Sequence, residues 1–295
     1  MKKPDRSYFV KPTSSAGKKI YLHEWNESEK NVVLFVHGFP GCGEQACLIT
    51  STPLLKSFRL IAIDRPGYGK SENQLGLTPM KLAQQLVEIL DEMGIDRIRI
   101  LSVSGGAPFS LALALLLKDR VVKLSSIGGV APLTPKNFRY MSSQQKKAWL
   151  FVMLVPYPLA NKILNRFWQK GLDEIDEFLF TKTGLEGGVD DAVFSHPEIS
   201  SILSETLKSA LQQGPKAVLR DLKIYAKYWG FKMEQIDCPI TLWHGTLDDV
   251  VHYTYASEMQ LRLKNANLKM IPNEGHYSLP MNFRDQIIGD LLMID

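Results

Sequence analysis

Short apolar segments rich in β-branched residues alternate along this chain with segments of helical periodicity. The segments in the middle of the chain are apolar almost throughout, as expected of parallel strands that are covered on both faces. Strands that alternate with helices predict an α/β fold with a mostly parallel, doubly wound sheet of eight strands, flanked by helices. The eight predicted strands are 8–10, 18–26, 32–38, 58–64, 97–104, 121–131, 240–245 and 267–276, of which the first two form an antiparallel start.

The clearest helix signal lies at 78–94. Thr78 is suited to cap the helix, Pro79 suits its first position, and Gly94 suits its end. Apolar residues recur on one face of this segment: Leu82, Leu86, Ile89, Leu90 and Met93. Further helices are predicted at 253–266 and 282–295, so helices separate or follow most of the predicted strands.

Residues 133–237 break this alternation. They hold long, largely helical segments rich in aromatic residues, such as 215–231, and no clear strand. We therefore expect a helical cap, or lid, inserted between core strands 6 and 7. The α/β core would then consist of residues 1–132 and 238–295.

The composition limits the classes of function that the chain can have. Its 295 residues are 45% hydrophobic and 22% charged, which is typical of globular proteins. The net charge is only +4, and the Lys and Arg residues are scattered, so no nucleic-acid partner is expected. The longest apolar run, 149–160, contains two prolines and is too short to cross a bilayer, so no stable membrane insertion is expected.

The cysteine content and the N-terminus point to the cytoplasm. Cys42, Cys47 and Cys238 are odd in number and irregularly spaced, which argues against a disulfide framework and favours a reducing compartment. The first residues carry two lysines without a following apolar stretch, unlike a signal peptide. We expect a cytoplasmic protein that is a monomer or a homodimer.

Ser104 stands where a predicted strand runs straight into a predicted helix. The flanking residues Ser102 and Gly106 are small, as the tight turn of a G-x-S-x-G-like nucleophile motif requires. Such a turn lifts the serine oxygen above the sheet and directs the backbone N–H of Gly105 toward the reacting oxygen. The alternative is an ordinary strand–loop–helix junction that happens to carry a serine.

A serine hydroxyl needs a base, and the base needs an orienting acid. His276 follows the last predicted strand, and the carboxyl ends of strands are where functional groups gather in such sheets. Asp248 and Asp249 follow the strand at 240–245, whereas the loop after 121–131 carries no carboxylate. The alternatives are a surface histidine and a solvated acidic turn.

The turn HGFPG at 37–41 follows another strand and offers a free backbone N–H, which we assign to Phe39. With the N–H of Gly105 it would form an oxyanion hole. His37 is expected to be structural, since one histidine base suffices. The segment 64–71 ends like a phosphate-binding loop, but Asp64 stands in place of its first glycine, so phosphate binding is rejected there.

Five motifs occur in the order and spacing seen in the α/β-hydrolase superfamily, which the chain resembles over about residues 20–280. They are HGFPG, DRPGYGKS, SVSGG, WHGTLDDVV and EGH, and the segment QGPKAVLRDLKIYAKYWGF is similar to the end of the cap in lid-bearing members. The resemblance implies that Ser104 is the nucleophile, Asp248 the acid and His276 the base. Phe39 and Gly105 would supply the oxyanion hole, and neither a metal nor a cofactor is expected.

Two positions depart from the family pattern. Ser102 replaces the usual glycine two residues before the nucleophile, which is tolerated because serine is still small. His252 stands where the family often has proline, and this change gives it no evident role.

The resemblance implies a serine hydrolase that cleaves a small ester or thioester through an acyl-enzyme intermediate. A serine nucleophile disfavours the dehalogenases and epoxide hydrolases of the superfamily, which use aspartate. Gly105 replaces the tryptophan that usually follows the serine of proline iminopeptidases. Aminopeptidase-like peptidase, C–C bond hydrolase, acyltransferase and cofactor-free haloperoxidase-like activities stay open, as does a non-catalytic ligand receptor on the same fold.

Aromatic residues of the predicted cap suggest a substrate with an apolar acyl or aromatic group. We place Trp149, Phe151 and Trp168 in the substrate pocket. The cap also contains Tyr157, Phe167, Phe178 and Phe180. The alternative is that these residues pack the cap onto the core. Because every catalytic candidate lies outside 133–237, we expect the cap to set substrate choice and to leave the chemistry to the core.

Overall fold

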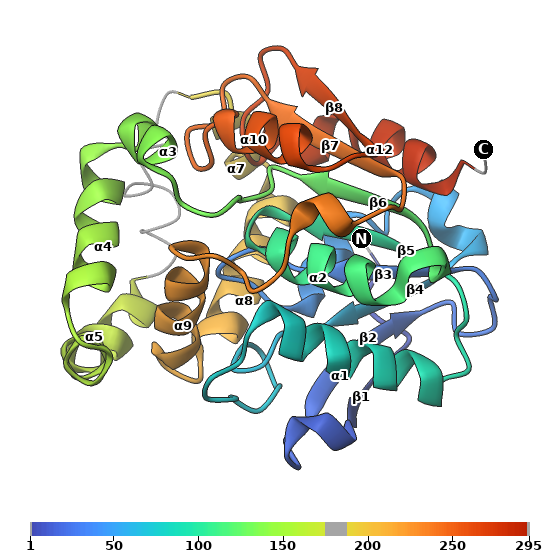
Figure 1. Cartoon of the computed structure of the whole chain (residues 1–295), viewed down its shortest axis with the longest axis horizontal. Coiled ribbons are helices and arrows are strands. Elements are labelled where there is room, and N and C mark those ends of the chain that lie inside the picture. Colours follow the sequence, from blue (N-terminus) through green and yellow to red (C-terminus); the bar gives the residue numbers. More distant parts are fainter. Residues whose placement is uncertain (1, 175–187, 294–295) are drawn as a thin grey trace.

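The computed structural model describes residues 2–174 and 188–293. Within these residues, eight strands form one sheet in the order β1-β2-β4-β3-β5-β6-β7-β8 (Figure 1). β2 runs antiparallel to both β1 and β4, and the other neighbours are parallel. The predicted fold class is confirmed. The strands are β1 (Arg6–Val10), β2 (Ile20–Trp25), β3 (Val32–Val36), β4 (Arg59–Ile63), β5 (Ile98–Val103), β6 (Val121–Ile127), β7 (Ile240–Gly245) and β8 (Ala266–Ile271).

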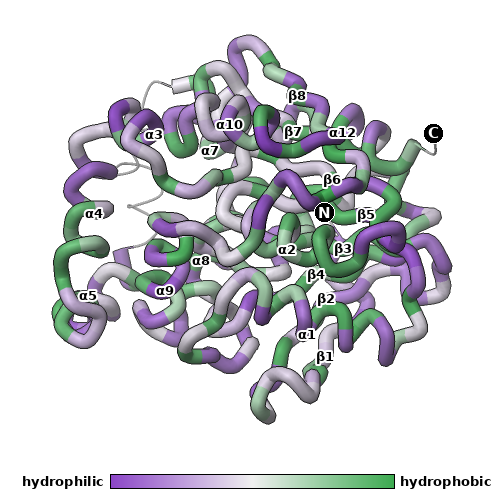
Figure 2. The backbone as a smooth tube through the Cα atoms, in the orientation of Figure 1, coloured by the Kyte–Doolittle hydropathy of each residue, from purple (hydrophilic) through white to green (hydrophobic). Residues whose placement is uncertain are grey.

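Both faces of the sheet are buried. In β3, Val32, Leu34 and Val36 belong to one apolar cluster, and Val33 and Phe35 belong to another on the opposite face. The first cluster includes residues of α1 (Pro79–Glu92), α2 (Ala107–Leu117) and α10 (Thr254–Arg262), and the second includes residues of α12 (Arg284–Leu292). Figure 2 shows hydrophobic residues concentrated on the central strands and on α2. The continuous apolar character of these strands therefore reflects burial on two sides.

Predicted element ends differ from the observed ones in places. The helix at 78–94 is confirmed as α1, and the Thr78 side chain accepts a hydrogen bond from the Lys81 N–H. The helix predicted at 215–231 ends early, as α9 (Lys216–Tyr225). Trp229 and Phe231 instead enter the first apolar cluster from an irregular segment, in which Gly230 adopts a φ of +87°.

The predicted cap, residues 133–237, is called the inserted segment below. Its described residues form helices and no strand; they follow β6 and precede β7 in the sequence, and most of them lie to the left of the sheet in Figure 1. Besides α9, the helices are α3 (Pro135–Tyr140), α4 (Ser143–Leu154), α5 (Tyr157–Asp173), α7 (Asp191–Phe194) and α8 (Pro197–Leu211). Phe178 and Phe180 lie outside the described residues. None of the helices in the described part of the chain has the length and apolar character needed to cross a membrane.

Candidate active site

The predicted site residues gather at one edge of the sheet. β3, β5, β6, β7 and β8 are parallel neighbours, so their carboxyl ends lie side by side. Gly38 follows β3, Ser104 follows β5 and Gly128 follows β6. Asp248 follows β7, and His276 follows β8. The loops after β3, β5, β7 and β8 are called the edge loops below.

Ser104 occupies a strained turn between β5 and α2. Its φ is +49°, a left-handed conformation that non-glycine residues rarely adopt. The residues around it are small because the backbone is crowded: a Cβ atom on Gly106 would lie 2.6 Å from the carbonyl oxygen of Val36. Ser102 is accommodated because its hydroxyl pairs with that of Ser110 at 2.9 Å. The strand–turn–helix context expected of a nucleophile is therefore present.

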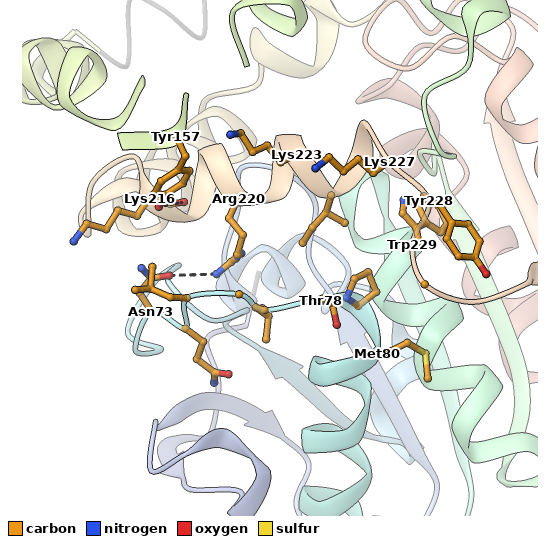
Figure 3. Close-up of a pocket in the computed structure, with 17 residues that line it drawn as sticks. Asn73, Thr78, Met80, Tyr157, Lys216, Arg220, Lys223, Lys227, Tyr228 and Trp229 are labelled. Carbon is orange, nitrogen blue, oxygen red and sulfur yellow. Dashed lines mark hydrogen bonds between the residues drawn. The ribbon is translucent and has the colours of Figure 1, made fainter. Parts of the chain in front are cut away.

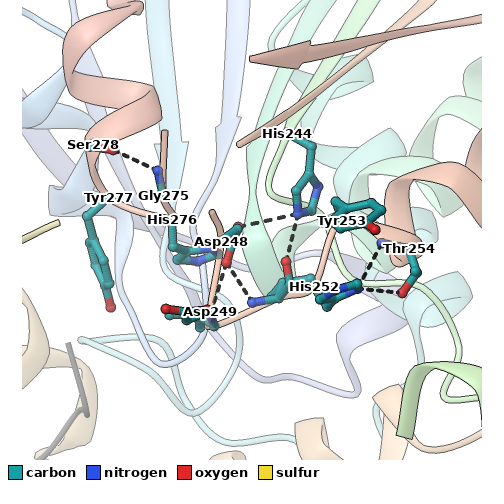
Figure 4. A network of polar contacts seen from close by, with 12 residues as sticks. His244, Asp248, Asp249, His252, Tyr253, Thr254, Gly275, His276, Tyr277 and Ser278 are labelled. Carbon is teal, nitrogen blue, oxygen red and sulfur yellow. Dashed lines mark hydrogen bonds and ion pairs between the residues drawn. The ribbon is translucent and has the colours of Figure 1, made fainter. Parts of the chain in front are cut away.

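Asp248 and His276 form a buried pair (Figure 4). His276 Nδ1 lies 2.8 Å from Asp248 Oδ2, and the other carboxylate oxygen accepts the backbone N–H groups of Val250 and Val251 at 3.0 and 2.7 Å. These contacts fix the carboxylate in one orientation. Asp249, the other candidate acid, is exposed.

The pair perturbs the pKa of both groups. Burial alone would raise the pKa of Asp248, but the charge of His276 and hydrogen bonds from His244 and His276 outweigh it and lower the pKa. Burial alone would lower the pKa of His276, but the charge and hydrogen bond of Asp248, with the charge of Asp190, raise it. The arrangement therefore favours an ionised carboxylate beside a histidine that readily accepts a proton.

Asp190, from the inserted segment, holds the loop that carries His276. Its side chain is buried and accepts three backbone N–H groups, those of His276 at 3.0 Å, Tyr277 at 3.0 Å and Ser278 at 2.7 Å. A Cβ atom on Gly275 would lie 2.5 Å from the Asp190 carboxylate, which explains the glycine of the EGH motif. Asp190 thus fixes the backbone at the histidine.

A buried polar network supports the turn after β3. Arg65 donates from Nη2 to the carbonyl oxygen of Gly38 at 2.9 Å and pairs with Asp221 of α9 at 2.5 Å. Tyr225 of α9 donates its hydroxyl to the carbonyl oxygen of Gly105 at 2.9 Å. The two residues predicted to supply the oxyanion hole, Phe39 and Gly105, therefore lie in turns that the inserted segment contacts.

His37 contributes to the same turn through backbone contacts. Its Nε2 accepts the N–H of Arg65 at 2.9 Å, and its Nδ1 donates to the carbonyl oxygen of Gly38 at 2.8 Å. Burial and the nearby charge of Arg65 lower its pKa well below the usual value, which keeps the ring neutral. These contacts fit the structural role expected of His37.

Ser104 and His276 line one small cavity of about 100 Å³. Apart from His276, the described residues that line it are uncharged and largely apolar. They are Phe35, Gly38, Phe39, Pro40, Gln45, Leu48, Ile49, Val103, Ser104, Ile127, Val193, Ile199, Leu203, His276, Tyr277, Pro280 and Met281. Val193, Ile199 and Leu203 come from the inserted segment.

The three predicted pocket aromatics lie elsewhere. Trp149 lines a separate cavity beside the Asp248 loop. Phe151 packs against an apolar cluster built on α4, α5 and α9, and Trp168 donates its indole N–H to the carbonyl oxygen of Leu211 at 2.9 Å. None of the three is among the described residues that line the cavity at Ser104.

Two residues without a predicted role have ordinary packing contacts. The His252 ring stacks on Tyr140, with the ring centres 4.4 Å apart. Cys42 is buried against Tyr68, Ala210 and Ala217, where burial raises the pKa of its thiol well above the usual value. Neither residue lines the cavity at Ser104.

Sequence reasoning missed several residues that support the site. The role of Gly128 could have been predicted, because two glycines follow the β6 strand. Glycine at such a position often marks a place where another group lies close to the backbone. A Cβ atom there would lie 3.1 Å from the His276 ring. Asp190, Asp221 and Tyr225 gave no such signal, because their contacts join positions far apart in the sequence.

Comparisons with known proteins agree with this architecture. The family model described as "alpha/beta hydrolase fold" matches residues 31–282. The chain is 24% identical over 277 residues to 2-hydroxy-6-oxononadienedioate/2-hydroxy-6-oxononatrienedioate hydrolase 2 of Pseudomonas putida, covering 88% of this chain and 86% of that protein. It is also 25% identical over 280 residues to the chloroplastic protein PHYLLO of Arabidopsis thaliana, covering 87% of this chain but only 15% of that protein.

Solved structures share the fold across nearly the whole chain. A carboxylesterase structure from Nitrososphaera gargenis superposes with a TM-score of 0.72 at 16% identity, covering 97% of this chain and 98% of that one. A bromoperoxidase from Bacillus anthracis gives a TM-score of 0.70 at 19% identity, covering 97% and 99%. Because the family model spans most of the sequence, the chain belongs to the α/β hydrolase fold family and is a hydrolase.

Proposed function

We propose that this hydrolase cleaves a small ester or thioester through Ser104, His276 and Asp248, with an acyl-enzyme intermediate. The observation that carries the proposal is their arrangement at the sheet edge. Ser104 stands on a left-handed turn, shares a cavity with His276, and His276 is paired with the buried Asp248 at 2.8 Å. A nucleophile, a base and an orienting acid in this relation are what acyl transfer requires.

The chemistry follows from these roles. Ser104 Oγ attacks the carbonyl carbon of the substrate, and its proton passes to His276 Nε2, the ring nitrogen not bound by Asp248. The resulting oxyanion accepts hydrogen bonds from the backbone N–H groups of Phe39 and Gly105. When the intermediate collapses, His276 returns the proton to the leaving alkoxide or thiolate. Water then attacks the acyl-enzyme by the same route and releases the acid.

The cavity favours a short, uncharged acyl group. Its volume is about 100 Å³, and the described residues that line it include neither Lys nor Arg. The relative from Pseudomonas putida is named for a dioate, a substrate with two carboxylates. That relative makes C–C bond hydrolysis the second candidate, but an apolar cavity suits an uncharged acyl group better than a dianion.

Other activities on this fold differ in the leaving group or the acceptor, which the geometry at Ser104 does not distinguish. They are peptide hydrolysis and acyl transfer to an alcohol or amine. The proposed substrate is a small molecule. A cytoplasmic location and a monomeric or homodimeric state stay predictions from the sequence.

The proposal is tested by labelling the purified protein with a serine-reactive fluorophosphonate and locating the adduct by mass spectrometry. We expect the adduct on Ser104, no labelling of Ser104→Ala, and normal labelling of the control Ser28→Ala, an exposed serine outside the cavity at Ser104. Hydrolysis of a matched series of nitrophenyl esters and thioesters should then fall with acyl length. An adduct on a different serine, or labelling of Ser104→Ala, would contradict the proposal.

A further inference from the structure

A distinct cavity outside the Ser104 site lies between the 73–80 loop and α9, and it is called the basic cavity below (Figure 3). Its volume is about 650 Å³, within the range of small-molecule sites. It shares no described lining residue with the cavity at Ser104. It is therefore a separate concavity and not an extension of the proposed active site.

Four cationic residues line one side of the basic cavity. Lys216, Arg220, Lys223 and Lys227 are spaced by four, three and four residues, which places them along one face of α9 and its C-terminal extension. Figure 3 shows their side chains along this helix. Among the described residues that line the cavity, none is acidic. The cavity therefore concentrates positive charge in a chain whose net charge is only +4.

Most of this charge is uncompensated. Arg220 is 9% exposed and pairs with Asp221 at 2.8 Å. Within the described part of the chain, Lys216, Lys223 and Lys227 form no ion pair with a carboxylate. The Lys223 ammonium instead lies 5.4 Å from the centre of the Tyr157 ring. Three ammonium groups along one wall of the hollow attract an anion that carries more than one charge.

The opposite wall is braced in place by hydrogen bonds. Gln74 and Gln85 of α1 exchange hydrogen bonds at 3.2 and 2.7 Å, and Lys81 donates to the carbonyl oxygen of Gly76 at 3.1 Å. Arg220 joins the two walls by donating to Asn73 Oδ1 at 3.3 Å (Figure 3). Such a preformed hollow lowers the cost of ordering the site around a ligand.

Apolar and aromatic groups complete the lining. Tyr157, Tyr228 and Trp229 lie among the lining residues, with Leu77, Met80 and Ile224. A ligand that fits this surface combines several negative charges with a flat or aliphatic part. Because Arg220 is nearly buried and the charges line a hollow, the site suits a small molecule better than a flat anionic membrane.

We propose that the basic cavity binds a small organic polyanion that carries phosphate or carboxylate groups. The site is independent of the proposed catalysis at Ser104, so binding does not require an active enzyme.

Isothermal titration of the full chain at low salt tests the proposal with three probes: inorganic pyrophosphate, citrate and ATP. We expect at least one to bind with one-to-one stoichiometry and to weaken as salt is added. The Ser104→Ala variant should bind equally well, which separates this proposal from the proposed catalytic function. Lys223→Ala/Lys227→Ala should weaken binding about tenfold or more, as expected for the loss of charged hydrogen bonds.

The matched control is Lys136→Ala/Lys162→Ala, which removes the same charge from exposed lysines outside the cavity. At about 0.15 M salt it should leave the affinity within about twofold of the parent, since charges farther apart than about 8 Å are then largely screened. Equal weakening by both double variants would overturn the proposal. So would no binding of any probe at millimolar concentration, or binding only to vesicles of anionic lipid.

Discussion

The edge loops and the inserted segment make different kinds of contact around Ser104. The edge loops carry the side chains proposed to react, namely Ser104, Asp248 and His276. The inserted segment contributes polar side chains that form hydrogen bonds with the backbone of those loops. Asp190 accepts N–H groups at His276, and Tyr225 donates to the carbonyl oxygen of Gly105. It also supplies apolar side chains to the cavity wall.

This difference changes the roles that the sequence predicted for the inserted segment and the core. The inserted segment was expected to set substrate choice and to leave the chemistry to the core. Val193, Ile199 and Leu203 line the cavity at Ser104, in keeping with a part in substrate choice. Asp190 and Tyr225, however, contact the backbone of the proposed machinery directly. We therefore expect the segment to hold the reactive groups in place without supplying one.

The largest effect is expected from the acid of the edge loops. Asp248→Asn should lower kcat about 10⁴-fold, because the amide no longer holds the imidazole in the required tautomer. Asp249→Asn is the matched control, and it should change kcat little because Asp249 is exposed. Ester hydrolysis measured for both variants checks the ranking. A reversed ranking would show that the wrong carboxylate has been chosen.

The next largest effect is expected from Asp190, in the inserted segment. Asp190→Asn replaces Oδ2, which accepts the His276 N–H at 3.0 Å, with an amide that cannot accept it. Loss of one charge-assisted hydrogen bond corresponds to about a 10- to 100-fold fall in kcat, with little change in KM. Steady-state kinetics measure the effects on kcat and KM separately. A rise in KM at unchanged kcat would mean that Asp190 shapes the pocket and does not hold the base.

Asp190→Asn should also shift the pH dependence of kcat/KM, in a direction that follows from the charges around His276. The negative charges of Asp248 and Asp190 both raise the pKa of His276, while burial opposes them. Removing the charge of Asp190 makes the protonated ring less stable, so the pKa falls. The acid limb of the kcat/KM profile should therefore move to lower pH, since His276 must be neutral to act as the base. A shift to higher pH would contradict this electrostatic assignment.

A smaller effect is expected at the cavity wall. Leu203→Ala removes apolar contact from the inserted segment and enlarges a cavity of about 100 Å³. We expect the preference for short over longer acyl esters to fall about tenfold, since contacts of this size contribute about 1–3 kcal/mol. The ratio of kcat/KM across an ester series measures it, with Leu261→Ala, an exposed residue of α10, as the control.

The smallest effect is expected at the Gly105 turn. Tyr225→Phe removes the hydroxyl that donates to the Gly105 carbonyl oxygen and should lower kcat about two- to tenfold, the range of one neutral hydrogen bond. Tyr68→Phe is a suitable control, because the buried Tyr68 hydroxyl has no hydrogen-bond partner within the described residues. Equal losses in both variants would point to packing and not to the turn.

The sequence predicted the sheet well because its signals are local. β3 is buried on both faces, and the pattern VVLFV is apolar at every position, which identifies the strand without knowledge of its neighbours. The cap of α1 at Thr78 was likewise readable from residues within one turn. Helix ends were less predictable, since Trp229 and Phe231 are drawn into the core by contacts that no local pattern reveals.

The same contrast between local and long-range signals applies to the candidate site. Ser104, Asp248 and His276 could be selected because each follows a strand at the edge where parallel strands end together. The placement of Trp149, Phe151 and Trp168 could not be judged, because an aromatic residue on a helix packs equally well inward or toward a pocket. The role of Asp190 could not be predicted for another reason: its hydrogen-bond partners lie 86 to 88 positions away in the chain.

We expect the inserted segment to hold the proposed catalytic groups in place as well as to line the cavity. The most direct measurement is the rate at which a small fluorophosphonate labels Ser104, since this reagent reports on nucleophile and base with little use of the acyl pocket. We predict that Asp190→Asn slows labelling about tenfold or more, while Leu203→Ala labels at the parent rate. Parent-like labelling of a stably folded Asp190→Asn would contradict the claim.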